Sequence, residues 1–490
     1  MLTRRALLKT IPAAGLAMTL PYVHAAPVGV DVDDLLDKLK TVVVTAVSMI
    51  PEVGGILGAI VSMLWPEPTR DVWGEIRHQV EAMIDEKIDG AVFNLLQAKL
   101  NGLGDALKLY LQAVAAQDRD TIRMQFIATN TQFVAAAPEF QNPAYAWTLL
   151  PLFAIFTQFH MALLRDCVLH GKDWGWSAAS FADVANEATR TTQAYLAHID
   201  RVAAAQRAEL AKRAPSSPGQ HQTAIYDYWQ PFEQRLTLLV DDFRVLLVYL
   251  DPVAHPEATR EFPFKDVYSR AYGTADDWDR TCAQWAANGV ATPFSAPLAG
   301  FSAIDIELFN RTPRVVNVRY PAGKGPKQWS GQRTDATGII ADPLGGVEKY
   351  TVDFPAPAPD KRFNVEKAVV TSGSIPLALT LVLDDGSRKT LWNRTDLPGA
   401  PTEEVAVPGR MLTTLNMWSR SRFYDRDLGC LILGFSRDTR YVPPHAREAL
   451  YIGAVVQPDT GPAFLPHGIS STLQARRDAF WRAIELRSRR

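Results

Sequence analysis

The sequence predicts a multidomain protein, with a helical N-terminal part followed by an all-β C-terminal part. From residue 30 to about residue 250, apolar residues recur every three or four positions, which is the period of an amphipathic helix. After about residue 260, short β-branched segments alternate apolar and polar residues between turn residues. With 490 residues, the chain is long enough for two or three domains.

The composition indicates an ordinary globular protein. Hydrophobic residues make up 47% of the chain and charged residues 21%. The 51 basic and 53 acidic residues leave a formal net charge of −2, which argues against a nucleic-acid binder held by bulk positive charge. Three widely separated cysteines, Cys167, Cys282 and Cys430, are too few for a disulfide framework.

Residues 1–26 have the layout of a twin-arginine export signal. Arg4 and Arg5 lie in TRRALLK, a moderately apolar stretch follows, and the small residues of VHAA mark a cleavage site. The apolar stretch is short and interrupted by Ala, Gly and Pro, so it is a poor membrane anchor. We therefore expect a secreted protein, exported through the twin-arginine pathway, whose mature chain begins near Ala26.

Residues 30–258 are expected to form a bundle of about seven helices. In VWGEIRHQVEAMIDEKIDGAVFNLL the apolar residues form one stripe at helical spacing: Trp73, Ile76, Val80, Ile84, Ile88, Val92 and Leu95. PFEQRLTLLVDDFRVLLVYL repeats the pattern, with Pro231 near the start, where a helix tolerates it. Breaks at PEPT, PEFQNP, GKDWG and APSSPGQ separate the helices.

The segment Tyr145–Leu164 is predicted to be the central, apolar helix. It contains no Lys, Arg, Asp or Glu, and at about 1.5 Å per residue its length of about 30 Å matches the hydrocarbon core of a bilayer. A helix that is apolar on nearly every side must be surrounded by protein or by lipid. The segment is therefore either the core helix of a soluble bundle, or a helix that is buried in water and later crosses a membrane.

The preceding helix carries two different lines of residues. Ile122, Phe126, Thr129 and Phe133 fall on one line, and Thr121, Gln125 and Gln132 on another. The short loop PEFQNP then predicts an antiparallel hairpin over about residues 119–164. In a membrane the apolar helix would face lipid and the polar stripe would face water, whereas in water the same hairpin is an ordinary bundle pair.

The segment from 262 to 490 is expected to be an all-β domain. AIDIELF, RVVNVRY, EKYTVDF, NVEKAVV and LGCLILGF are short and alternating. TLVLDDGSRKTLW is a strand, an Asp-Gly turn and a strand, which is the strongest hairpin signal in the chain.

Residues 50–260 resemble the N-terminal helical domain of the three-domain insecticidal crystal toxins, the Cry delta-endotoxins. IPEVGGILGAIVSMLWP is similar to their second helix, IRMQFIATNTQFVAAAPEF to the fourth, LLPLFAIFTQFHMALLRDCVLHGKDWGW to the central fifth, and YDYWQPFEQRLTLLVDDFRVLLVYLDP to the seventh. The resemblance implies a pore-forming bundle whose fourth and fifth helices insert into the target-cell membrane, with the fourth helices lining a homo-oligomeric pore. It implies that these residues line the pore or act in insertion: Arg123, Gln125, Asn130, Gln132, His160, Arg165 and Asp166.

The chain also departs from that family's pattern. Ala128 stands where the fourth helix usually carries an acidic residue, which puts the ion selectivity of a pore in doubt. The family generally lacks an export signal. About 230 residues follow the bundle, which suits one β domain better than the family's two.

The β half has a resemblance of its own. AVVTSGSIPLALTLVLDDGSRKTL is similar to the strand–turn–strand of a β-prism, as in jacalin-like lectins and the second domain of the toxin family. This implies binding of a glycan or protein receptor through loops at one end of the prism. The candidate loops QWSGQRTD and WSRSRFYDRDLG combine aromatic rings with arginines: Trp329, Arg333, Trp418, Arg420, Phe423 and Tyr424.

A search for chemical motifs finds no phosphate-binding GxxxxGK[ST], no HExxH and no GxSxG. The nine histidines show no zinc-site spacing. We therefore expect a secreted pore-forming toxin with no catalytic residue, cofactor, metal or nucleic-acid partner. Two alternatives stay open: a secreted carbohydrate-binding protein with a helical scaffold, and an exported enzyme whose active site follows no known motif.

Overall fold

The computed structural model describes most of the chain between residues 35 and 437. The described residues are 35–49, 53–66, 71–84, 86–217, 223–259, 261–274, 300–309, 311–321, 327–330, 347–356, 365–394, 399–422 and 425–437. The predicted export signal over residues 1–26 and the last part of the predicted β domain lie outside these residues.

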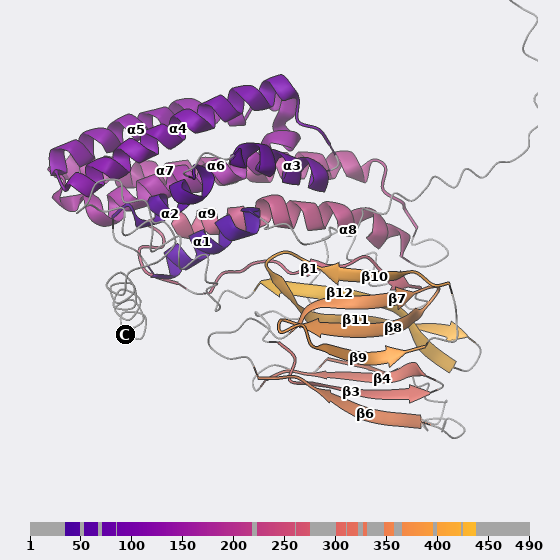
Figure 1. The fold of residues 1–490 in the computed structure, drawn as a ribbon. Helices are drawn as coiled ribbons and strands as arrows, with labels where there is room; N and C mark the ends of the chain where they lie inside the picture. The colour runs from indigo at the N-terminus through magenta and orange to yellow at the C-terminus, as the bar shows by residue number, and fades with distance from the viewer. Residues whose placement is uncertain are drawn as a thin grey trace, which may run out of the picture.

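The N-terminal part is a bundle of helices (Figure 1). In chain order they are α1 (Leu35–Met49), α2 (Gly55–Leu64), α3 (Val72–Ile84), α4 (Gly90–Ala116), α5 (Arg119–Phe140), α6 (Ala146–His170), α7 (Ala178–Ala211), α8 (Ala224–Leu236) and α9 (Asp242–Leu250). A π-helical turn, η3 (Thr237–Asp241), joins α8 and α9 into one continuous helix. The prediction of a helical bundle is confirmed.

One predicted stripe belongs to two helices instead of one. The apolar residues from Trp73 to Leu95 share a single period, but α3 ends at Ile84 and α4 begins at Gly90. The Asp89 side chain caps α4, accepting hydrogen bonds from the backbone N–H groups of Ala91 and Val92 at 2.9 and 3.1 Å. The capping residue therefore overrides the continuous apolar period.

Helix α6 occupies the centre of the bundle, as predicted. It contacts α2, α5, α7 and α9, and every residue from Leu149 to Cys167 is buried. Burial on all sides is what a helix apolar on nearly every face requires in water.

The described residues of the C-terminal part, from 267 to 437, form three four-stranded antiparallel sheets. The first contains β1 (Val267–Tyr268), β12 (Asp425–Arg437) and β11 (Arg410–Arg422), with β2 (Tyr272–Gly273) also paired to β12. The second has the order β10 (Thr402–Ala406), β7 (Val365–Ser372), β8 (Pro376–Leu383) and β9 (Arg388–Asn393). The third has the order β5 (Lys327–Ser330), β4 (Thr312–Arg319), β3 (Ala303–Phe309) and β6 (Val347–Asp353).

The three sheets enclose one apolar core, which gives the predicted β-prism-like arrangement. Ile306 of the third sheet, Leu379 of the second and Leu431 of the first belong to the same buried cluster. The predicted Asp-Gly turn joins β8 to β9, and Gly386 has a φ of 80°, a conformation that glycine adopts without strain. The fold class predicted from the sequence is therefore confirmed.

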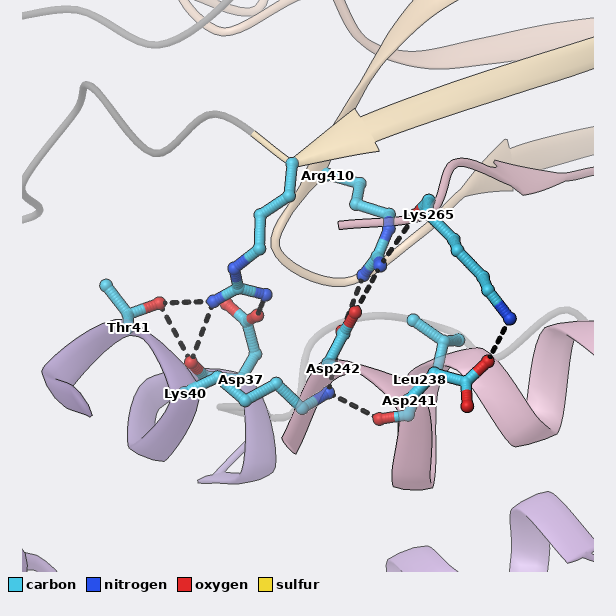
Figure 2. Close-up of polar contacts among 9 residues, drawn as sticks. Asp37, Lys40, Thr41, Leu238, Asp241, Asp242, Lys265 and Arg410 are labelled. Carbon is cyan, nitrogen blue, oxygen red and sulfur yellow. Dashed lines mark hydrogen bonds and ion pairs between the residues drawn. The ribbon is translucent and has the colours of Figure 1, made fainter. Parts of the chain in front are cut away.

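A buried ion-pair network connects the bundle to the prism (Figure 2). The guanidinium of Arg410, at the start of β11, donates to both carboxylate oxygens of Asp242 on α9, at 3.0 and 2.7 Å. These two side chains are 0% and 1% exposed. The ammonium of Lys40 on α1 lies 3.4 Å from the same carboxylate and donates to the carbonyl of Leu238.

A second pair ties α1 to the end of β12. Arg437 donates to the carboxylate of Asp37 at 2.5 Å and to the hydroxyl of Thr41 at 2.8 Å. Burial alone would raise the pKa of Asp37 and of Asp242, but the neighbouring cations outweigh burial and hold both pKa values below the ordinary value. Buried ion pairs thus attach helices α1 and α9 to the prism.

Candidate membrane-inserting hairpin

Helices α5 and α6 form a tight antiparallel hairpin, as the sequence predicts. The Asp118 carboxylate caps α5 by accepting from the backbone N–H of Thr121 at 3.2 Å. The connection contains one 3-10 turn, η1 (Pro143–Tyr145), which the side chain of Asn142 caps by accepting from the N–H of Ala144 at 3.0 Å. Local polar side chains therefore fix the start of α5 and the start of the turn that follows it.

Helix α5 packs with the predicted apolar line inward. Ile122, Phe126, Thr129 and Phe133 are all buried, and the Thr129 hydroxyl donates to the carbonyl of Ala106 on α4 at 3.2 Å. On the predicted polar stripe, Gln125 is half-buried and Gln132 is exposed. The inward and polar lines of the sequence analysis are therefore two distinct faces of the folded helix.

The solvent-facing side of α5 carries exposed apolar side chains, which the sequence analysis missed. Met124, Ile127 and Val134 are 60%, 48% and 51% exposed. Their spacing of three and seven residues was visible in the sequence, but apolar residues at helical spacing normally indicate a buried face. Helix α5 therefore presents apolar residues to the solvent as well as to the core, beside the polar stripe that contains Gln125 and Gln132.

His160, in the middle of α6, belongs to a hydrogen-bonded chain across three helices. Its Nδ1 lies 2.6 Å from the hydroxyl of Tyr195 on α7, and its Nε2 lies 2.8 Å from Oδ1 of Asn130 on α5. Nδ2 of Asn130 donates to the carboxylate of Glu187 at 2.9 Å. Asn130 and His160, two of the residues predicted to act in the hairpin, are therefore in direct contact.

The direction of one of these hydrogen bonds fixes the proton on Nε2 of His160. A carboxylate only accepts, so the amide of Asn130 points toward Glu187 and its oxygen faces His160. His160 therefore donates from Nε2. Because burial disfavours a charged imidazole, the ring is neutral and its Nδ1 accepts from the Tyr195 hydroxyl. The ring also stacks on Phe133, with centroids 5.1 Å apart and an interplanar angle of 12°.

Thr157 and Gln158, the polar side chains beside His160 in the apolar segment, are neutral, and their donor groups are hydrogen-bonded. The Thr157 hydroxyl donates to the carbonyl of Ala154 at 2.7 Å. The amide of Gln158 donates to the carbonyls of Ala154 and Phe243, at 3.1 and 3.0 Å. Helix α6 thus carries its polar side chains without a single ionised group between Ala146 and Leu164.

The first charges of α6, Arg165 and Asp166, have separate partners. Arg165 donates to the carbonyls of Tyr249 and His255, at 3.3 and 2.7 Å. Asp166 accepts from the N–H of Gly54, at 2.9 and 3.0 Å, and from the hydroxyl of Tyr110 at 2.6 Å. Burial raises the pKa of Asp166 in spite of these donors. These contacts hold the end of the apolar segment against α2, α4 and α9.

Arg123 lies near the start of α5, at the same open end of the hairpin as the C-terminal end of α6. It forms an ion pair with Asp120 at 3.0 Å and donates to the carbonyl of Gly175. The partners Glu187, Tyr195, Tyr110 and Gly54 were not predicted, because no local pattern links residues that lie thirty or more positions apart in the chain.

The predicted receptor-binding residues fall mostly outside the described side chains. Trp418 is half-buried on β11 and packs beside the buried cluster that contains Tyr226 and Ile432. Trp329 and Arg420 belong to β5 and β11, but their side chains are outside the description. Arg333, Phe423 and Tyr424 lie outside the described residues altogether.

A cleft of 780 Å³ opens beside the hairpin loop. Its lining comprises Glu86, Lys87, Asp89, Gln141, Pro143, Ala144, Tyr145, Ala146, Trp147, Thr148, His198, Arg201, Val202, Ala205 and Gln206. The imidazole of His198 contacts Arg201 at 2.9 Å instead of a hydroxyl or a thiol, so the cleft offers no nucleophile paired with a base. Within the described ranges, no three His, Cys, Asp or Glu residues are grouped to hold a metal ion.

Comparison with known proteins decides the family of the helical half. A model of the delta endotoxin N-terminal domain family matches residues 42–251, which span α1 to α9. The helical half of this chain is a delta-endotoxin N-terminal domain. Pesticidal crystal protein Cry1Ib from Bacillus thuringiensis subsp. entomocidus is 27% identical over 231 residues, covering 46% of this chain and 31% of the relative. Cry1Id from Bacillus thuringiensis is 28% identical with the same coverage, so this chain spans less than a third of the length of these relatives.

Solved structures share the fold of both halves of this delta-endotoxin-like chain. The insecticidal delta-endotoxin Cry8Ea1 from Bacillus thuringiensis has a TM-score of 0.57 at 17% identity, covering 83% of this chain and 73% of that one. The mosquito-larvicidal Cry4Aa toxin from Bacillus thuringiensis has a TM-score of 0.60 at 10% identity, covering 82% and 74%. Since the bundle alone is less than half of the chain, this coverage includes the β-prism-like part.

Proposed function

We propose that this chain is a pore-forming toxin of the delta-endotoxin type, which inserts the α5–α6 hairpin, about residues 119–164, into a target-cell membrane. The observation that carries the proposal is α6 itself. Among the described helices it is the one long and apolar enough to cross a membrane, and it lies inside a domain that belongs to the delta-endotoxin family. The core helix of a soluble protein passes the same length test. The match to the delta-endotoxin family is therefore what supports membrane insertion of α6.

The chemistry of the hairpin suits a transfer from protein to lipid. The segment from Ala146 to Leu164 has no charge, and each charge at the centre of a bilayer would cost about 2.5–3.5 kcal/mol on insertion scales. His160 is neutral, so it adds no ionic penalty. The soluble bundle and the inserted hairpin are then two states of one chain, and a membrane favours the second by offering α6 apolar neighbours in place of protein.

The remaining predicted residues take defined places in this proposal. Gln125 and Gln132 would face the water-filled side of an oligomeric pore. Arg165 and Asp166 would lie where α6 leaves the hydrocarbon. Arg123 would lie where α5 enters it.

The two halves would divide the work. Residues 30–258 would form the pore, and residues 262–490 would select the target through a glycan or protein receptor, using residues that include Trp329 on β5 and Trp418 on β11 instead of in the predicted loops. Secretion through the twin-arginine pathway stays a prediction from residues 1–26. N-terminal sequencing of exported protein, compared with an Arg4→Lys, Arg5→Lys variant that should stay inside the cell, tests it.

Dye release from liposomes tests the proposed function. The chain from Ala26 onward, with and without protease treatment, should release an entrapped dye in proportion to protein concentration. A carbohydrate-binding protein on a helical scaffold would bind glycans without release, and an absence of release under all conditions would contradict the proposal.

A further inference from the structure

Glu139 is the one charged residue between Met124 and Phe140 on α5. Its Oε1 lies 2.9 Å from the ammonium of Lys99 on α4. Its Oε2 is buried and has no hydrogen-bond partner among the described residues. The carboxylate therefore depends on a single cation, which a different helix supplies.

Helical geometry places Glu139 on the polar stripe of α5. Counting from Thr121, steps of four and three residues lead to positions 125, 128, 132, 135 and 139. At about 100° per residue these positions share an arc of about 80°, and they extend along about 27 Å of the helix. The stripe consists of Thr121, Gln125, Ala128, Gln132, Ala135 and Glu139. Its one ionisable member lies in the last turn, beside the hairpin loop.

Insertion of the hairpin would separate the two partners. Lys99 belongs to α4, which lies outside residues 119–164, so Glu139 would travel with the hairpin and lose its ammonium. A free carboxylate does not face lipid without a large penalty. The stripe that carries it also carries both glutamines, and this is the side that faces water in the proposed pore.

We propose that Glu139 makes the pore selective for cations. This inference rests on the proposed pore-forming function and adds to it the residue that sets ion preference. Each copy of the chain in the pore contributes one carboxylate at the same depth, and a ring of carboxylates is how cation channels exclude anions. Glu139 thereby supplies the acidic group that position 128, an alanine in this chain, does not provide.

Reversal potentials of pores in planar bilayers under a KCl gradient test this assignment. Wild-type pores should favour K⁺ over Cl⁻, and Glu139→Gln should lower that permeability ratio by about threefold or more. The matched control is Lys99→Gln, which breaks the same ion pair in the soluble protein but leaves the carboxylate on α5. It should keep the wild-type ratio.

A charge-swapped double variant, Lys99→Glu with Glu139→Lys, guards against a folding defect because it keeps an ion pair in the soluble bundle. Its pores should prefer Cl⁻. An unchanged ratio in conducting Glu139→Gln or charge-swapped pores, or equal shifts in Glu139→Gln and Lys99→Gln, would overturn the role of Glu139 and leave the pore function standing. Failure of the wild-type protein to conduct would overturn the pore function, and this inference with it.

Discussion

His160 Nε2 lies 2.8 Å from Oδ1 of Asn130, so the central helix α6 is hydrogen-bonded to the helix with which it forms the hairpin. On its other side, His160 accepts a hydrogen bond from Tyr195 on α7. The first bond stays within the hairpin and can persist when the hairpin moves, whereas the second must break. The imidazole therefore marks the boundary between the part proposed to insert and the part proposed to stay.

Removing the Tyr195 hydroxyl should weaken the soluble bundle. In Tyr195→Phe, Nδ1 of His160 stays buried without a donor, which costs about 1–3 kcal/mol. Chemical denaturation should show this loss. Tyr145→Phe, at an exposed position in the hairpin loop, is the control and should change stability by less than about 0.5 kcal/mol. Equal stability of the two variants would contradict the structural role of the network.

Breaking the Arg410–Asp242 pair should destabilise the contact between bundle and prism. Arg410→Met leaves the Asp242 carboxylate buried without its bidentate partner, with Lys40 at 3.4 Å and the weaker influence of Arg437 remaining, and breaking a buried pair by removing one partner costs about 3–5 kcal/mol. Lys349→Gln, in an exposed pair with Glu307, should cost less than about 1 kcal/mol. Thermal unfolding of both variants measures the difference, and a small effect of Arg410→Met would show that the pair is not important for stability.

The same network predicts loss of stability in acid. The pKa values of Asp37 and Asp242 lie below the ordinary carboxyl value of about 3.9, so their stabilisation is complete above that pH and is lost as the pH falls through the folded-state pKa values. Urea unfolding between pH 7 and pH 3 should show the loss below about pH 4. Asp37→Asn should reduce this acid-dependent loss, and an unchanged pH profile would argue against the assignment.

The exposed apolar face of α5 should act in membrane binding instead of in folding. Met124→Ser, Ile127→Ser and Val134→Ser together remove side chains that are about half exposed or more in the soluble protein, so thermal stability should change little. Each side chain would gain about 1.5–3 kcal/mol on burial in an apolar environment, so the triple variant should release markedly less dye. Leu95→Ser with Leu109→Ser, on exposed positions of α4, is the matched control and should keep wild-type release.

The sequence predicted those elements whose signal is local. The central helix followed from a long uncharged run, the hairpin from the PEFQNP loop, and the β8–β9 turn from Asp-Gly. The split between α3 and α4 was missed because the apolar period continues through Asp89, whose side chain caps α4. The prediction of functional residues was weaker, since Asn130 and His160 were chosen separately. Their direct contact, and the contacts that each makes with α7, depend on tertiary packing.

The ion-pair network between bundle and prism could not be predicted from the sequence either. Nothing in the sequence around Asp37 or Asp242 distinguishes them from solvent-exposed acids of amphipathic helices. They become buried because Arg437 and Arg410 lie opposite them in the fold, about 400 and 168 positions away in the chain. Matched charges from distant segments are a property of the assembled structure, which periodicity cannot reveal.

The central claim is that α5 leaves α4 when the protein acts on a membrane, and an engineered disulfide tests it most directly. Ala106 and Thr129 are in contact, with the Thr129 hydroxyl 3.2 Å from the carbonyl of Ala106, so Ala106→Cys with Thr129→Cys can join the two helices. The oxidised variant should bind liposomes and release no dye, and reduction should restore release to the level of the single-cysteine controls. Full release by the oxidised protein would show that the hairpin need not separate from α4, and would contradict the account.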